Sequence, residues 1–202
     1  MGSSPENTAA DYLDLSLGEF LDRVASGEAA PGGGSVAAIA VALAAGLAGM
    51  AARLSASQLA EAPELAERAD ASRWRAAPMA TSDAESYGHV LDAYREPDPE
   101  TRTARVRDAL SGAADVPLSV AEIGNDVAGI AARLVEEGNP NLEGDAMTAV
   151  LLADAGVRAA AALAGINLSS ADVDDARLGR ANELVQQAAE TVRRARGEDG
   201  RG

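Results

Sequence analysis

The sequence has no cysteine and no lysine, and only one histidine among its 202 residues. Without thiols it forms neither a disulfide framework nor a thiolate zinc site, and one histidine argues against a histidine-rich metal site. We therefore expect no metal, no prosthetic group and a cytoplasmic location. The 17 basic residues are all arginines against 32 acidic ones, giving a formal net charge of -15. Because this charge repels nucleic-acid phosphates and anionic lipid surfaces, we expect neither nucleic acid nor a membrane as partner.

Long apolar runs are also rare. The uncharged run from Val36 to Ala52 is slightly shorter than a membrane span and consists mainly of alanine and glycine, which insert poorly into lipid. It predicts a buried helix whose small side chains let neighbouring backbones approach. Residues 1–11 are polar and lack the basic and apolar segments of a secretion signal, so they predict a disordered tail.

Apolar residues recur at helical spacing nearly everywhere, and no strand pattern competes, so the sequence predicts an all-α fold. With few aromatic residues, the core must come from Leu, Val, Ile and Ala, which favours a compact bundle of six or seven helices in one domain over 12–197. The expected helices are 16–27, 35–57, 63–94 with a break at Pro78, 99–114, 116–138, 143–164 and 172–196. Two of them, 35–57 and 143–164, are apolar on all sides, so we expect a homodimer that buries the second face.

A glycine loop, Pro31-Gly32-Gly33-Gly34-Ser35, leads into the first of these apolar helices. Each glycine costs about 1 kcal/mol against alanine inside a helix, so something needs the bare backbone here. The loop follows no strand and the chain has no lysine, which excludes a dinucleotide fingerprint and a Walker loop. With Ser35 as the expected N-cap, the helix start would attract an anion or a carbonyl oxygen. Close helix packing explains the glycines equally well.

Several segments, in order along the chain, resemble the family of formiminotetrahydrofolate cyclodeaminases and methenyltetrahydrofolate cyclohydrolases. The likeness spans about 15–168. The segments are Ala30-Pro31-Gly32-Gly33-Gly34-Ser35-Val36-Ala37-Ala38, Asp83-Ala84-Glu85-Ser86-Tyr87, Arg95-Glu96-Pro97, Val116-Pro117-Leu118 with Glu122, Gly138-Asn139-Pro140-Asn141 through Asp145, and Ile166-Asn167-Leu168.

This resemblance implies an all-helical subunit that dimerises and binds folate in a cleft near the glycine loop and the subunit interface. The substrate would be a tetrahydrofolate derivative carrying a one-carbon unit. In such a family the 5-formimino group loses ammonia as the 5,10-methenyl ring closes, or water opens that ring to give the 10-formyl compound. Both reactions need proton transfers at nitrogen and no redox cofactor.

Asp83 aligns with the acidic catalytic position of the family, so it is the expected proton donor and acceptor. It suits this role if burial raises its pKa from about 4 toward 6 or 7. Asn139 and Asp145 would bind a pterin-like ring or simply cap local backbone. Arg102 would hold a folate carboxylate or, as we favour from sequence, pair with Asp98 or Glu100. The expected substrate-binding residues are Gly32, Gly33, Gly34, Ser35, Glu122, Asn139, Asp145 and Asn167.

Two departures from the family pattern leave an alternative open. The segment Ser55-Ala56-Ser57-Gln58-Leu59 replaces a lysine-bearing segment, and Leu163-Ala164 replaces an Asn-Val pair. A cation and an amide are thereby lost. The alternative is a divergent member with another substrate, or a non-catalytic helical dimer that binds a folate-like ligand or a partner protein.

Overall fold

Helices are the only regular elements in residues 11–172 and 175–198, the part of the chain that the computed structural model describes. The all-α prediction is therefore confirmed. The described residues hold eight α-helices, because Pro78 divides the region expected as one interrupted helix into α3 and α4. They are α1 (Leu17–Val24), α2 (Gly33–Arg53), α3 (Ala62–Ala76), α4 (Met79–Tyr94), α5 (Pro99–Gly112), α6 (Asp115–Glu137), α7 (Glu143–Ser170) and α8 (Ala176–Ala195).

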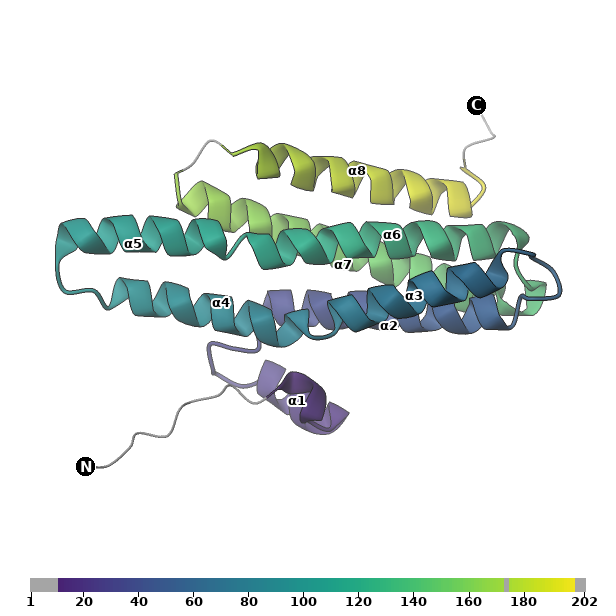
Figure 1. Cartoon of the computed structure of the whole chain (residues 1–202), viewed down its shortest axis with the longest axis horizontal. Helices are drawn as coiled ribbons and strands as arrows, with labels where there is room; N and C mark the ends of the chain where they lie inside the picture. Colours follow the sequence, from purple (N-terminus) through teal and green to yellow (C-terminus); the bar gives the residue numbers. More distant parts are fainter. Residues whose placement is uncertain (1–10, 173–174, 199–202) are drawn as a thin grey trace.

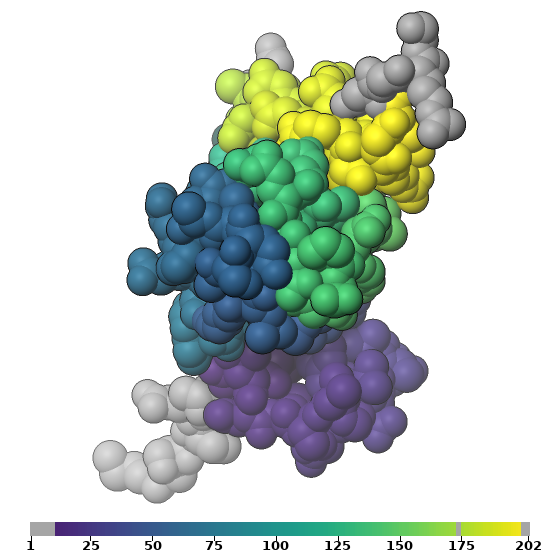
Figure 2. Space-filling model, turned by 90° about the vertical axis from the view of Figure 1, so that its right-hand side faces the viewer, coloured from purple at the N-terminus to yellow at the C-terminus, as the bar shows by residue number. Residues whose placement is uncertain are grey.

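The helices form two layers with one helix at each edge (Figure 1). One layer contains two long rows, α3 followed by α4 and α5 followed by α6, and the other contains α2 and α7 packed side by side. The end-on view places α8 and the N-terminal α1 at opposite edges of the bundle (Figure 2). The breaks between α3 and α4 and between α5 and α6 lie near the start of α2, where the chain leaves room for a cleft.

Small residues bring α2, α6 and α7 into close contact. Val41 of α2 is fully buried between Gly124 and Gly156. A Cβ on Gly156 would lie 2.5 Å from Val41 Cγ2, and one on Gly124 would lie 3.1 Å from the same atom. These helices are rich in alanine and glycine because their backbones approach too closely for larger side chains.

Most helix ends follow the sequence signals, and several differ. Helix α2 ends at Arg53, four residues before the expected end at 57, and α8 begins at Ala176, four residues after the expected start at 172. The expected capping box of Ser16 and Glu19 starts α1. The expectation that Ser35 is an N-cap is wrong, because Gly32 occupies that position and the buried Ser35 hydroxyl donates to the carbonyl of Ala80 at 2.7 Å. Helix α7 continues past the expected end at 164 to Ser170, since no breaker interrupts it and Leu168 is fully buried.

Asp11, the last residue of the expected tail, is the first residue that the structure describes. Asp11 is the N-cap of a short 3-10 helix, η1 (Tyr12–Asp14), and accepts a hydrogen bond from Thr81 Oγ1 at 3.0 Å. Asp11 therefore belongs to the folded part. The rest of the expected tail, residues 1–10, lies outside the described residues, as do 173–174 within the last expected helix.

Two helices, α2 and α7 with the turn before it, are long and apolar enough to cross a membrane by length and composition alone. The most apolar 18-residue window is 61% buried in α2 and 44% buried in the second. Burial within the bundle accounts for the apolar character of α2. The outer face of α7 and part of that of α2 stay uncovered, with Leu43 and Ile166 about three-fifths exposed, at 59% and 61%.

Candidate active site

A cleft of about 270 Å³ lies between the glycine loop, α4, the end of α5 and the C-terminal part of α7. The start of α2 forms one wall, with Gly32, Gly33 and Gly34. Asp83 lies opposite, in the first half of α4, and Asn167 contributes from α7. Residues that are more than 130 positions apart in the sequence therefore meet in one place.

The Asp83 carboxylate lies directly against the start of α2. A Cβ on Gly34 would lie 2.6 Å from Asp83 Oδ2, and closer still to Oδ1 and Cγ, so only glycine leaves room for this carboxylate. The Ser35 hydroxyl is 3.4 Å from Asp83 Oδ2. The helix start thus has an anion of its own chain beside it, where unpaired amides and the helix dipole favour negative charge.

Burial raises the pKa of Asp83 above its ordinary value, and hydrogen bonding from the amide and the hydroxyl of Ser35 partly offsets this rise. No cation contributes to the shift among the described residues. A carboxyl group with a raised pKa keeps its proton to a higher pH than an exposed one, so beside a cleft it can act as an acid as well as a base. The upward direction of this pKa shift is the one expected of a catalytic acid.

Five of the predicted site residues line this cleft together: Gly32, Gly33, Gly34, Asp83 and Asn167. Ser35 lies just behind it, hydrogen-bonded to the Asp83 carboxylate and to α4. Asn167 uses its side-chain amide to donate to the carbonyl of Ala113 at 2.9 Å, which ties α7 to the junction of α5 and α6. The glycine loop and the acidic segment are therefore brought into one site.

Three other predicted residues do not line the cleft of their own chain. Glu122, in the first half of α6, forms an ion pair with Arg180 of α8 at 3.3 Å. Asn139 donates to the carbonyl of Leu54 at 3.0 Å and caps the turn before α7, and Asp145 lies in the first turn of that helix. Because α2 has 21 residues, its two ends are about 30 Å apart, and Asn139 lies at the end opposite the cleft.

Comparison with known proteins places this arrangement in a family. A model of the family described as formiminotransferase-cyclodeaminase matches residues 16–188. The chain belongs to this formiminotransferase-cyclodeaminase family. A methenyltetrahydrofolate cyclohydrolase of Methylorubrum extorquens is 34% identical over 164 residues, covering 76% of this chain and 79% of the relative. The crystal structure of formiminotetrahydrofolate cyclodeaminase from Thermotoga maritima matches with a TM-score of 0.82 and 28% identity, covering 92% of this chain and 96% of that one.

Sequence reasoning missed several cleft residues in this member of the cyclodeaminase family. Ser86, Tyr87 and Val90 follow Asp83 at three, four and seven positions, so they share its side of α4 and line the cleft. This helical spacing from Asp83 could have identified them as cleft residues from the sequence. Leu163 also lines the cleft; it belongs to the Leu163-Ala164 pair that the sequence analysis interprets as a departure from the family pattern. A Cβ on Gly33 would lie 3.6 Å from Leu163 Cδ1, so an apolar side chain faces the glycine loop here.

The other departure, at 55–59, lies far from Asp83 within the chain. The Ser55 hydroxyl accepts from the amide of Asn139 at 2.9 Å, at the opposite end of α2. A lysine in this segment, as the family resemblance leads us to expect, would therefore not lie beside Asp83 in the same subunit.

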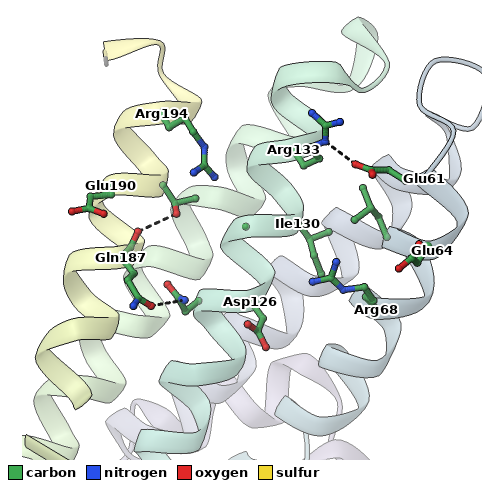
Figure 3. Close-up of a pocket in the computed structure, with 13 residues that line it drawn as sticks. Glu61, Glu64, Arg68, Asp126, Ile130, Arg133, Gln187, Glu190 and Arg194 are labelled. Atoms are coloured by element: carbon green, nitrogen blue, oxygen red, sulfur yellow. Dashed lines mark hydrogen bonds and ion pairs between the residues drawn. The ribbon is translucent and has the colours of Figure 1, made fainter. Parts of the chain in front are cut away.

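A larger hollow of about 560 Å³ lies between α3, α6 and α8 and contains none of the predicted site residues (Figure 3). Its arginines are largely paired with acids of the chain itself. Arg133 donates to Glu61 at 2.7 Å, and Arg194 donates to Glu136 at 3.0 Å. We place the candidate site in the smaller cleft, because only there do the glycine loop and a carboxyl group with a raised pKa meet.

Proposed function

We propose that this chain is an enzyme of folate one-carbon metabolism, of the methenyltetrahydrofolate cyclohydrolase or formiminotetrahydrofolate cyclodeaminase type. The position of Asp83 carries the proposal. It is a carboxyl group whose pKa is raised by burial, it faces a cleft, and the glycine at position 34 makes room for it. The names of the two relatives, which act on such folates, support the substrate class.

Asp83 would move the proton that each reaction requires. In ring opening, its carboxylate takes a proton from the water that adds to the methenyl carbon, and the acid returns a proton to the folate nitrogen whose bond to that carbon breaks. In ring closure, it takes the proton from the attacking folate nitrogen and donates it to the leaving ammonia. The atoms balance without electron transfer, so the proposal includes no prosthetic group.

A spectrophotometric assay of the 5,10-methenyl chromophore tests this function in both directions. The purified wild-type chain should deplete 5,10-methenyltetrahydrofolate faster than buffer does, or form it from 5-formiminotetrahydrofolate with release of ammonia. Turnover in one direction assigns the type. If neither reaction exceeds the uncatalysed rate at any pH at which the chain stays folded, the proposed function is wrong.

We further propose that the enzyme is a homodimer formed through the outer faces of α2 and α7. These faces leave Val36, Leu43, Leu151 and Ile166 exposed. The edge helix α1 adds exposed Leu17, Leu21 and Val24 to the apolar surface that a single subunit leaves uncovered. Such apolar area is typical of obligate interfaces.

A homodimer also offers a place for the predicted residues at the far end of α2. If the twofold axis runs across α2 and α7, the far end of one subunit faces the cleft end of its partner. Asn139 and Asp145 would then complete the site around the partner's glycine loop. Within one subunit they lie about 30 Å from it, the length of the 21-residue α2.

Mixing two inactive variants tests this arrangement. We expect Asp83→Asn and Asp145→Asn each to lower turnover, and dimers reassembled from an equal mixture to regain roughly a quarter of wild-type turnover, since half of the mixed dimers' sites carry neither change. Sedimentation equilibrium gives the oligomeric state, and Glu143→Gln in the same helix turn is the matched control. No recovery on mixing places both residues in one subunit's site, and an active Asp145→Asn variant removes Asp145 from the site.

A further inference from the structure

A second hollow, of about 420 Å³, continues the cleft along the seam between α4 and α5. Its lining includes Tyr94, Arg102, Val106, Arg107 and Asp172. One buried apolar cluster borders both the cleft and the hollow. Val90, Leu110 and Ala113 line the cleft, and they form one buried cluster with Ala171, which lines the hollow; Val106, also of the hollow, packs against this cluster.

Arg102 is the half-buried cation of this hollow. Its guanidinium donates to the carbonyl of Glu96 at 3.2 Å, and no carboxylate of the described residues forms an ion pair with it. The surface pair expected from sequence is not formed, because Asp98 instead caps α5 by accepting from the amide of Thr101 at 2.8 Å. Most of the guanidinium donors of Arg102 therefore remain available.

The charge of the hollow differs from that of the whole protein. Arg107 pairs only with its neighbour Asp108, at 3.6 Å, and Asp172 is the one acid in the lining. With Asp108 beside Arg107, the cation left without an ion pair among the described residues of this hollow is Arg102, on a chain of net charge -15. A guanidinium fork matches the geometry of a carboxylate and binds it through two parallel hydrogen bonds.

We propose that this hollow binds the glutamate carboxylates of the folate substrate, with Arg102 and Arg107 as the binding residues; this rests on the proposed function. Asp83 and Tyr94 are 11 residues apart on α4, which places them about 16 Å apart along the helix. An aminobenzoyl ring followed by a glutamate spans the space between the reacting nitrogens and the arginines. The ring would lie over Val90 and Leu110, and further glutamates would extend past Arg107.

Calorimetric titration with two ligands tests the assignment. The ligands are 5-formyltetrahydrofolate and the matching pteroate, which has the same rings and no glutamate. We expect Arg102→Gln to raise the Kd of the folate about tenfold and to leave the Kd of the pteroate unchanged. Arg107→Gln should act in the same direction. Arg105→Gln is the matched control, because Arg105 lies on the same helix but pairs with Glu96 outside the hollow.

The titrations distinguish failure of the carboxylate site from failure of the proposed folate function. If the wild-type chain binds the folate and Arg102→Gln leaves that Kd unchanged, or weakens both ligands equally, the carboxylate site is wrong and the proposed function stands. If the wild-type chain binds neither ligand, the proposed function fails with it. Circular dichroism of each variant checks that helix content is retained, so that a loss of affinity reports the lost guanidinium.

Discussion

Replacing Asp83 by asparagine should lower kcat by about 100- to 10,000-fold, the range expected when a general acid-base group is removed. Asparagine has the same shape and keeps an oxygen that can accept from Ser35, so the start of α2 and the packing of α4 should be preserved. The measurement is the absorbance of the methenyl chromophore under saturating substrate. Glu85→Gln is the matched control, because Glu85 is a neighbouring exposed acid on α4 that does not line the cleft.

The pH dependence of the same pair of proteins should identify the titrating group. Wild-type kcat/KM should rise with pH through the raised pKa of Asp83, because the carboxylate form accepts the first proton. That rise should be absent in Asp83→Asn. Since the folded chain holds the Asp83 proton more tightly than the unfolded chain, this residue makes the free energy of unfolding fall as pH increases from 3.8 toward the raised pKa. An unchanged profile, or turnover close to wild type, would remove Asp83 from the mechanism.

Replacing Gly34 by alanine should lower kcat by about 100-fold while leaving the chain folded. The new Cβ would lie within 2.6 Å of all three outer atoms of the Asp83 side chain, so the carboxyl group must rotate away from Ser35 and from its position in the cleft. Alanine stabilises a helix by about 1 kcal/mol relative to glycine, which opposes the cost of the displacement. We therefore expect a large loss of turnover with a small change in Tm.

Two comparisons show whether Gly34 acts through Asp83. In the Asp83→Asn background, Gly34→Ala should cause little further loss of turnover, because two changes to one acting group are not additive. Gly129→Ala is the control for a glycine-to-alanine change in a helix, since a Cβ there meets no atom within 4 Å and the residue is outside the cleft. Full additivity of the two losses would show that Gly34 has a separate role, such as contact with the substrate.

Local sequence patterns predicted the helices that surround the cleft, but they did not predict which groups meet in it. The spacing of apolar residues predicts where the helices lie, and Pro78 predicts the break that starts α4. The glycine loop also marks a place where the backbone must stay bare, but it does not say for which partner. The structure identifies Asp83, 49 positions away, as the group that occupies that space.

The sequence by itself determined the helical class and most of the helix ends, because capping, helix breaking and hydrophobic periodicity depend on residues within a few positions of one another. It also determined the family, through short segments that occur in the same order along the chain. The tertiary structure decided which residues share a site. It brought Asn167 to the glycine loop, and it put Asn139 at the other end of α2 and left Arg102 without a surface partner. These placements depend on how whole helices pack, and the spacing of residues along one helix carries no information about its neighbours.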